Sequence, residues 1–142
     1  PSDGSSNVGG IATNYDFRNA IIGELIETQA TAEWVERLNN FNFQMTNENG
    51  ELLAEGSIKN AYDPLYRARH LRDQLLKRGR PLKAGDLLSL GNMGAIRPLK
   101  PNQYFDPSQR PVFRGNIATV SYIGLNPDGI ATVSVFIDRN SE

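Results

Sequence analysis

The feature that most constrains the fold of this chain is an alternating apolar run followed by a tight-turn signal. Phe41, Phe43 and Met45 alternate with polar residues, which is typical of a strand with one buried face. Asn49-Gly50 follows, and both residues tolerate the positive φ that a two-residue hairpin turn requires. Apolar residues after the turn continue as a return strand. We therefore predict a β-hairpin in this part of the chain.

A second segment predicts a helix with defined ends. Asp63 is a good N-cap, and Pro64 suits the first helical position because its φ is already close to the helical value. Gly79 stands where a left-handed residue often ends a helix. The apolar stripe between these ends consists of Leu65, Ala68, Leu71, Leu75 and Leu76. We expect the helix to pack this stripe against the sheet.

The remaining segments give weaker signals. Residues 15–40 fit a helix or a strand, and their apolar spacing favours a helix. The run Asp86–Leu90 predicts a short buried strand that ends in a glycine turn. The four prolines of residues 97–112 predict a long loop. Two closing strands are expected near 115–123 and 130–137, joined by a turn.

These elements predict an α+β fold in a single domain, residues 1–142. The sheet should be mainly antiparallel or mixed, as a sandwich or a roll, with one well-defined amphipathic helix. The chain has 142 residues, which is enough to form a hydrophobic core.

Composition excludes several classes of function. The chain has no cysteine, which excludes disulfides, thiolate zinc sites and a cysteine nucleophile. A formal net charge of −1 lacks the basic excess of most nucleic-acid-binding domains. No apolar run approaches the roughly 20 residues that span a bilayer. We expect a cytoplasmic protein with neither a nucleic-acid nor a membrane partner.

Several short motifs, in order, carry a resemblance to a known family. Leu82–Gly91, read after a helix that ends in glycine, is similar to a Leu-Lys-Ala-Gly-Asp-like turn into a strand in 2-keto-4-pentenoate hydratases. Asp3–Ser6 looks like their Asp-Asn-Ala-Ser segment, and Asn49-Gly50 looks like their hairpin turn. Tyr122–Leu125 and Val133–Phe136 resemble their final hairpin. The chain thus resembles the C-terminal part of the catalytic domain in this branch of the fumarylacetoacetate hydrolase superfamily.

The sequence also departs from the family pattern. Gly4 stands where the family has asparagine, and Leu90 stands where it has a hydroxyl residue, with Ser89 one place earlier. The segment 14–40 is longer than in the family, and the proline-rich loop at 98–111 looks like an insertion. These departures bear on the substrate more than on the fold.

The resemblance implies a metal-dependent hydratase that acts on 2-hydroxy-2,4-dienoate or 2-oxo-4-enoate acids. A 2-oxo acid decarboxylase, an acylpyruvate hydrolase and a non-catalytic binding or assembly module are the alternatives. The family holds magnesium or manganese with a Glu-x-Glu pair and a further carboxylate upstream of the segment that corresponds to Asp3–Ser6. No Glu-x-Glu occurs in this sequence. We therefore expect the chain to be inactive alone, and to form a homo-oligomer or to associate with an N-terminal fragment.

The resemblance also implies candidate site residues. Ser6 would lie near the substrate carboxylate and Asp3 would order its loop, and these two are the catalytic candidates. Ser89, Gly91, Asn92 and Gly94 are substrate-binding candidates, together with Ser6. Glycines allow a close approach of backbone N–H groups to an anion, although an ordinary turn would use the same residues.

Other polar residues favour a structural role. Glu24 with Glu27, and Glu33 with Glu36, are three residues apart and fit a solvated helix face. His70, the only histidine, fits a surface or helix-packing position better than a catalytic base. The basic stretch fits a solvated face better than an anion site; it comprises Arg67, Arg69, Arg72, Lys77, Arg78, Arg80 and Lys83. Trp34 is expected in the core or in a dimer interface.

Overall fold

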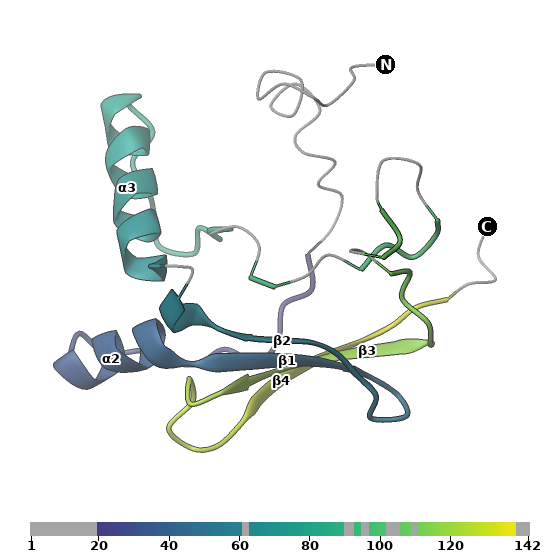
Figure 1. Ribbon diagram of the computed structural model, residues 1–142. Helices are drawn as coiled ribbons and strands as arrows, with labels where there is room; N and C mark the ends of the chain where they lie inside the picture. The colour runs from purple at the N-terminus through teal and green to yellow at the C-terminus, as the bar shows by residue number, and fades with distance from the viewer. Residues whose placement is uncertain are drawn as a thin grey trace, which may run out of the picture.

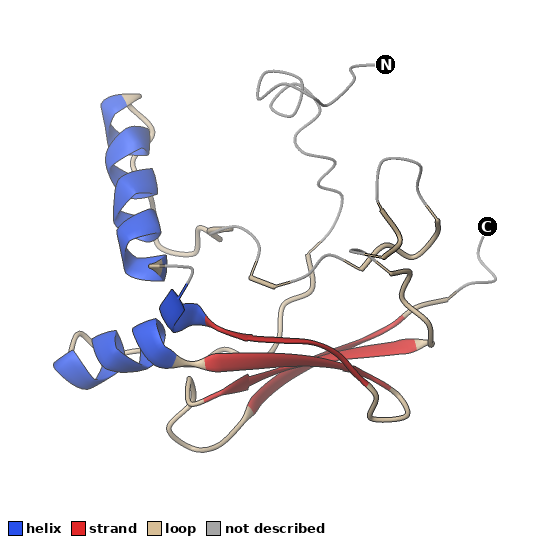
Figure 2. Ribbon diagram, viewed as in Figure 1, coloured by secondary structure: helices blue, strands red, loops and turns tan. Residues whose placement is uncertain are grey.

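The computed structural model describes residues 20–60, 63–89, 93–94, 97–101, 106–108 and 111–138. The elements in chain order are α2 (Ala32–Asn40), β1 (Asn42–Asn47), β2 (Leu52–Ser57), the short 3-10 helix η2 (Ile58–Asn60), α3 (Pro64–Lys77), β3 (Ile117–Ile123) and β4 (Ala131–Phe136). Figure 1 shows their arrangement, and Figure 2 shows that the strands lie together beneath a layer of irregular chain.

The strands form one sheet in the order β2-β1-β3-β4, and every neighbouring pair is antiparallel. The hairpin β1–β2 and the closing hairpin β3–β4 lie where the sequence predicts them. The long-range step is the pairing of β1 with β3, which joins the two hairpins at the centre of the sheet. The predicted α+β class with antiparallel strands is confirmed.

The turn between β1 and β2 is held by the side chain of Asn47. Its Oδ1 accepts hydrogen bonds from the amides of Asn49 (3.1 Å) and Glu51 (3.0 Å), and its Nδ2 donates to Glu51 Oε2 (2.9 Å). Gly50 takes a positive φ of 75°, but the loop between β1 and β2 spans residues 48–51 and is longer than the predicted two-residue turn, because the amide of Gly50 donates to Asn47 O (3.0 Å). The register shifts between Met45 and Thr46, so that β2 carries one extra residue as a bulge.

The two faces of the sheet differ in chemistry. One face carries Phe43 and Met45 with their cross-strand partners Tyr122 and Val120. Described parts of the segment between α3 and β3 lie over this face (Figure 1). The opposite face is mostly polar, with Thr119 Oγ1 and Ser134 Oγ 2.7 Å apart across β3 and β4, and it also carries the cross-strand pair Ile117 and Phe136. The most deeply buried apolar residues are Trp34, Phe41, Phe43, Ile58, Phe113 and Ala118.

Helix α3 has the ends that the sequence predicts. Asp63 Oδ1 accepts a hydrogen bond from the amide of Tyr66 (2.7 Å), Pro64 is the first helical residue, and Gly79 has a φ of 68°. Its packing is different from the prediction. α3 contacts α2 and stands away from the sheet in Figure 1, and Leu75 is only half-buried. The expectation that its stripe packs on the sheet is wrong, because η2 directly follows β2 and the chain turns away there.

The predicted strand Asp86–Leu90 is not formed over residues 86–89, which have no regular structure; Leu90 lies outside the described residues. Asp86 instead closes a turn, since its Oδ2 accepts from the amide of Lys83 (2.8 Å) and its own amide donates to Lys83 O (3.1 Å). Leu87 is 70% exposed. An apolar run becomes a strand only where it pairs with another strand, and residues 86–89 pair with none of the four strands of the sheet.

Segment 15–40 is helical only in its last part. Residues 20–31 contain no helix, and α2 begins after Thr31, whose Oγ1 accepts from the amide of Trp34 (3.3 Å). Trp34 is buried, as expected for a core residue. Ile22 and Leu25 are exposed, so the helical spacing before residue 30 is not used for packing within the described chain. Residues 15–19 lie outside the described residues.

Candidate functional site

The structure describes some of the predicted site residues and leaves others out. Asp3, Ser6, Gly91 and Asn92 lie outside the described residues, so their expected roles stay predictions. The two described candidates are in irregular chain. Ser89 is exposed and lies outside any helix or strand, whereas Gly94 lies against Phe43 of the sheet.

Gly94 lies directly against the ring of Phe43. It has a φ of 94°, and a Cβ added to it would stand 2.6 Å from Phe43 Cε2. Gly56, the cross-strand partner of Phe43, is equally close, and its added Cβ would stand 2.5 Å from Cζ. Glycine at both positions lets the β1–β2 hairpin and residues 93–94 meet at one aromatic ring.

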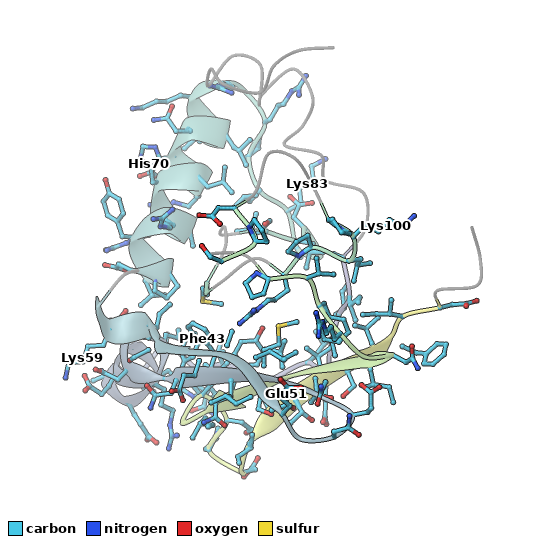
Figure 3. The ribbon with its side chains drawn as sticks, turned by 45° about the vertical axis from the view of Figure 1, so that its right-hand side comes forward. Phe43, Glu51, Lys59, His70, Lys83 and Lys100 are labelled. Atoms are coloured by element: carbon cyan, nitrogen blue, oxygen red, sulfur yellow. The ribbon has the colours of Figure 1, made fainter. Side chains whose placement is uncertain are left out.

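Figure 3 gives the setting of this contact. Phe43 lies on the sheet, and the irregular chain between α3 and β3 passes above it. The sequence predicted Phe43 as a buried strand residue but gave no signal that it would meet Gly94. That contact joins residues 51 positions apart, and only the folded sheet brings them together.

Arg97, three residues after Gly94, reaches the hairpin from the same segment. Its Nη2 donates to the carbonyl of Leu53, the extra residue of the β2 bulge. Its Nε is buried and has no hydrogen-bond partner among the residues that the structure describes. No carboxylate in the described part of the chain forms an ion pair with it. A guanidinium is always charged and carries five N–H donors, of which the bond to Leu53 uses one.

The backbone beside Arg97 is held by the core. Pro98 O accepts a hydrogen bond from the amide of Phe113 (2.8 Å), and Phe113 is only 2% exposed. Together with the Gly94 contact, this bond fixes the segment at two points on either side of Arg97. We call Phe43, Gly56, Gly94 and Arg97 the glycine–arginine site.

The remainder of the proline-rich loop contributes a local turn. Asp106 accepts hydrogen bonds from the hydroxyl (2.7 Å) and the amide (2.9 Å) of Ser108. These bonds lower the pKa of the Asp106 carboxyl, and the bond from the Ser108 hydroxyl is the larger cause. Asp106 is fully exposed, so the interaction shapes the loop rather than an enclosed site.

The described residues do not fit a magnesium or manganese centre. No three carboxylate, histidine or cysteine side chains among them come together as a possible ligand group. Two of the glutamates considered above have other partners: Glu33 pairs with Arg37 (2.9 Å) and Glu36 accepts from Asn40 Nδ2 (2.8 Å). These are surface contacts within α2.

His70 lies away from the glycine–arginine site. It stacks on Tyr66, with ring centroids 6.1 Å apart and planes inclined by 20°. Figure 3 places it on α3, far from Phe43. Arg69 and the neighbouring cationic residues of α3 are exposed. These placements agree with the surface roles favoured by the sequence.

Cavities also lie outside the glycine–arginine site in the described part of the chain. A cavity of about 250 Å³ lies between residues 21–26 and the β3–β4 hairpin, and its wall includes Glu24, Tyr122 and Thr132. Another of about 440 Å³ lies behind the end of α3, between Leu75 and Asp86. The second is lined by the exposed side chains of Arg80, Lys83 and Asp86, and the Asp86 carboxylate accepts a hydrogen bond from the amide of Lys83. In the part of the chain that is described, no helix is long and apolar enough to cross a membrane.

Comparisons with known proteins leave the family open. Neither a scan against models of protein families nor searches of curated proteins and of solved structures found a match. The resemblance to the hydratases therefore rests on the residues quoted for it alone.

Proposed function

We propose that this chain forms part of a metal-dependent hydratase that acts on small 2-hydroxy-2,4-dienoate or 2-oxo-4-enoate acids. The observation that supports this most is the contact of Gly94 with Phe43. It puts the end of the glycine turn that the family resemblance names against an apolar ring of the sheet. A carboxylate bound by the turn would have its hydrocarbon chain beside that ring.

The part of this chain in the reaction is to bind and orient the acid. Backbone N–H groups of the glycine turn, and the hydroxyl of Ser6, would donate hydrogen bonds to the substrate carboxylate. Magnesium or manganese would supply the charge that stabilises an enolate. The described residues form no ligand set for such an ion, so its carboxylates belong to an N-terminal fragment or another chain in this proposal.

Calorimetric titration with two acids tests the proposal. The probes are 2-oxopentanoate, a saturated analogue of the substrate, and pentanoate, which lacks only the 2-oxo group. We expect 2-oxopentanoate to bind about fivefold more tightly, since one additional hydrogen bond to the oxo group is worth about 1 kcal/mol. Equal affinities, or no binding of either acid, would contradict a 2-oxo acid site.

A non-catalytic binding or assembly module is the second candidate, and the absence of Glu-x-Glu from the sequence favours it. A turnover assay on 2-hydroxypenta-2,4-dienoate with Mg²⁺ separates the two when it is run with and without the N-terminal part of a hydratase of this family. Hydration only in the mixture supports the divided enzyme. Binding of 2-oxopentanoate without hydration in any mixture supports the module. The same assay, with product analysis, detects decarboxylase or acylpyruvate hydrolase activity.

A further inference from the structure

We propose that Arg97 binds the carboxylate of the substrate through its guanidinium group. The expectation from the sequence named hydroxyl and backbone donors at this carboxylate and no arginine. The inference rests on the proposed function for the identity of the acid. The anion-binding role itself rests on the surroundings of Arg97.

Part of the Arg97 guanidinium is enclosed without a hydrogen-bond acceptor in the described chain. Arg97 is half-buried, its Nη2 has a carbonyl partner at Leu53, and its Nε is enclosed without any partner. Enclosing a charged donor without an acceptor is unfavourable, so such donors in proteins are nearly always matched. A bound anion would supply the acceptor that the described chain does not.

The second step is that the fold does not require this side chain to hold the segment. The Pro98–Phe113 hydrogen bond and the Gly94–Phe43 contact already fix the backbone on both sides of it. The bond to Leu53 O uses one N–H, which a lysine could also donate. A purely structural role therefore explains Nη2 and leaves Nε unexplained.

The third step is the chemistry of the ligand. A guanidinium presents parallel N–H groups that match the two oxygens of a carboxylate, and such paired bonds are among the strongest in proteins. The apolar ring of Phe43, against Gly94 of the same segment, suits the short hydrocarbon chain of a small organic acid. Because Nε is enclosed, binding requires a local shift of the Arg97 side chain, which the test can observe.

The experiment follows the side-chain Nε–H signal of Arg97 by NMR in the 142-residue chain, during titration with pentanoate and with 2-oxopentanoate. Arg97→Lys keeps the charge and removes the paired donors, and Arg69→Lys on the exposed face of α3 is the matched control. We expect both acids to shift the Arg97 signal and the amide signals of Met93 and Gly94. Arg97→Lys should weaken binding about tenfold to hundredfold, and Arg69→Lys should leave it unchanged.

The outcomes separate this inference from the proposed function. If both acids bind equally and Arg97→Lys weakens both, Arg97 is an anion-binding residue and the preference for 2-oxo acids fails. If 2-oxopentanoate binds preferentially and Arg97→Lys has no effect, the function stands and the role of Arg97 is overturned. Absence of binding overturns both. A melt of Arg97→Lys adds a structural readout, because lysine can keep the bond to Leu53 O: weakened binding with an unchanged Tm supports the ligand-binding role, and a lower Tm with unchanged binding overturns it.

Discussion

The side chain of Asn47 holds the β1–β2 turn through hydrogen bonds to Asn49 and Glu51. It is buried, with 6% of its surface exposed, and its amide group makes hydrogen bonds to Asn49, Glu51 and the carbonyl of Arg114 (3.5 Å). The contact with Arg114 also ties the turn to the chain that leads into β3.

Asn47→Ala should lower the free energy of unfolding by about 1–3 kcal/mol, because it removes a buried side chain that accepts from the amides of Asn49 and Glu51 and donates to Glu51. Denaturant melts measure the change. Asn42→Ala is the control, since Asn42 is exposed in the same strand, and it should cost less than about 0.5 kcal/mol. Similar losses for the two variants would show that the Asn47 network contributes nothing.

Gly94→Ala tests the contact at the glycine–arginine site. Gly94 and Gly124 both have positive φ, at 94° and 86°, but only Gly94 has atoms within 4 Å of an added Cβ. Both alanine variants should lose about 1 kcal/mol to backbone strain. Gly94→Ala should lose a further 1–3 kcal/mol, roughly, through overpacking against Phe43. Equal thermal and denaturant melts for the pair would contradict the close contact.

Residues whose role depends only on their neighbours in the chain, such as helix caps and turn residues, could be predicted from the sequence. Asp63 as a cap, Gly79 beyond the end of α3 and Gly50 in the hairpin turn are confirmed because each role depends on local backbone geometry. The contact of Gly94 with Phe43 and the placement of Arg97 depend on the folded sheet. No local pattern contains that information, so the sequence predicted neither.

Helix α3 is an exposed element that depends on its own ends. It contacts α2, its stripe is at most half-buried, and Leu76 is 62% exposed. Local interactions should therefore account for a larger share of its stability than they do for a helix that packs on a sheet.

Asp63→Ala should weaken α3 by about 1 kcal/mol, because the Tyr66 amide loses its acceptor. Amide hydrogen exchange in the first turn should become faster by roughly fivefold, as that energy implies. Asp73→Ala is the control, since Asp73 is exposed and pairs only with its neighbour Arg72 among the described residues. Unchanged exchange at Tyr66 in the Asp63 variant would show that the cap is dispensable.

The elements differ in how well the sequence predicted them. Both hairpins and α3 combine periodicity with turn or cap residues, and the structure has them where they were expected. The run from Asp86 had apolar residues alone, without the turn or cap residues that mark the ends of the confirmed elements. The same limitation applies to residues 20–30, where apolar spacing occurs without a cap before Thr31.

At the scale of the whole molecule, the core lies between the sheet and the irregular layer, by which we mean the described residues between α3 and β3. Phe113 and Ile58 are its most enclosed large side chains. Phe113 belongs to the irregular layer, so this layer is part of the core even though it has no helix or strand.

Phe113→Ala should therefore lower the free energy of unfolding by about 3–5 kcal/mol. Leu75 is only half-buried, so Leu75→Ala should lower the free energy of unfolding by less than about 2 kcal/mol, because the larger losses occur at fully buried positions. Denaturant melts on the two variants compare the two regions. A larger loss for Leu75→Ala would place the core beneath α3 instead.

The candidate site was predicted less completely than the fold. Ser89 and Gly94 are described, and only Gly94 meets the sheet. Arg97 lies in a proline-rich loop, where a cation normally suggests solvent exposure. Its burial follows from the two contacts that fix the loop on the sheet, which are long-range.

The location of 2-oxopentanoate on the chain tests the central claim most directly. Backbone amide shifts can be recorded by NMR as the acid is added to the 142-residue chain. The account predicts saturable shifts concentrated at Phe43, Gly56, Gly94 and Arg97. Saturable shifts confined to the basic face of α3, or to the cavity beside β4, with none at these four residues, would contradict it.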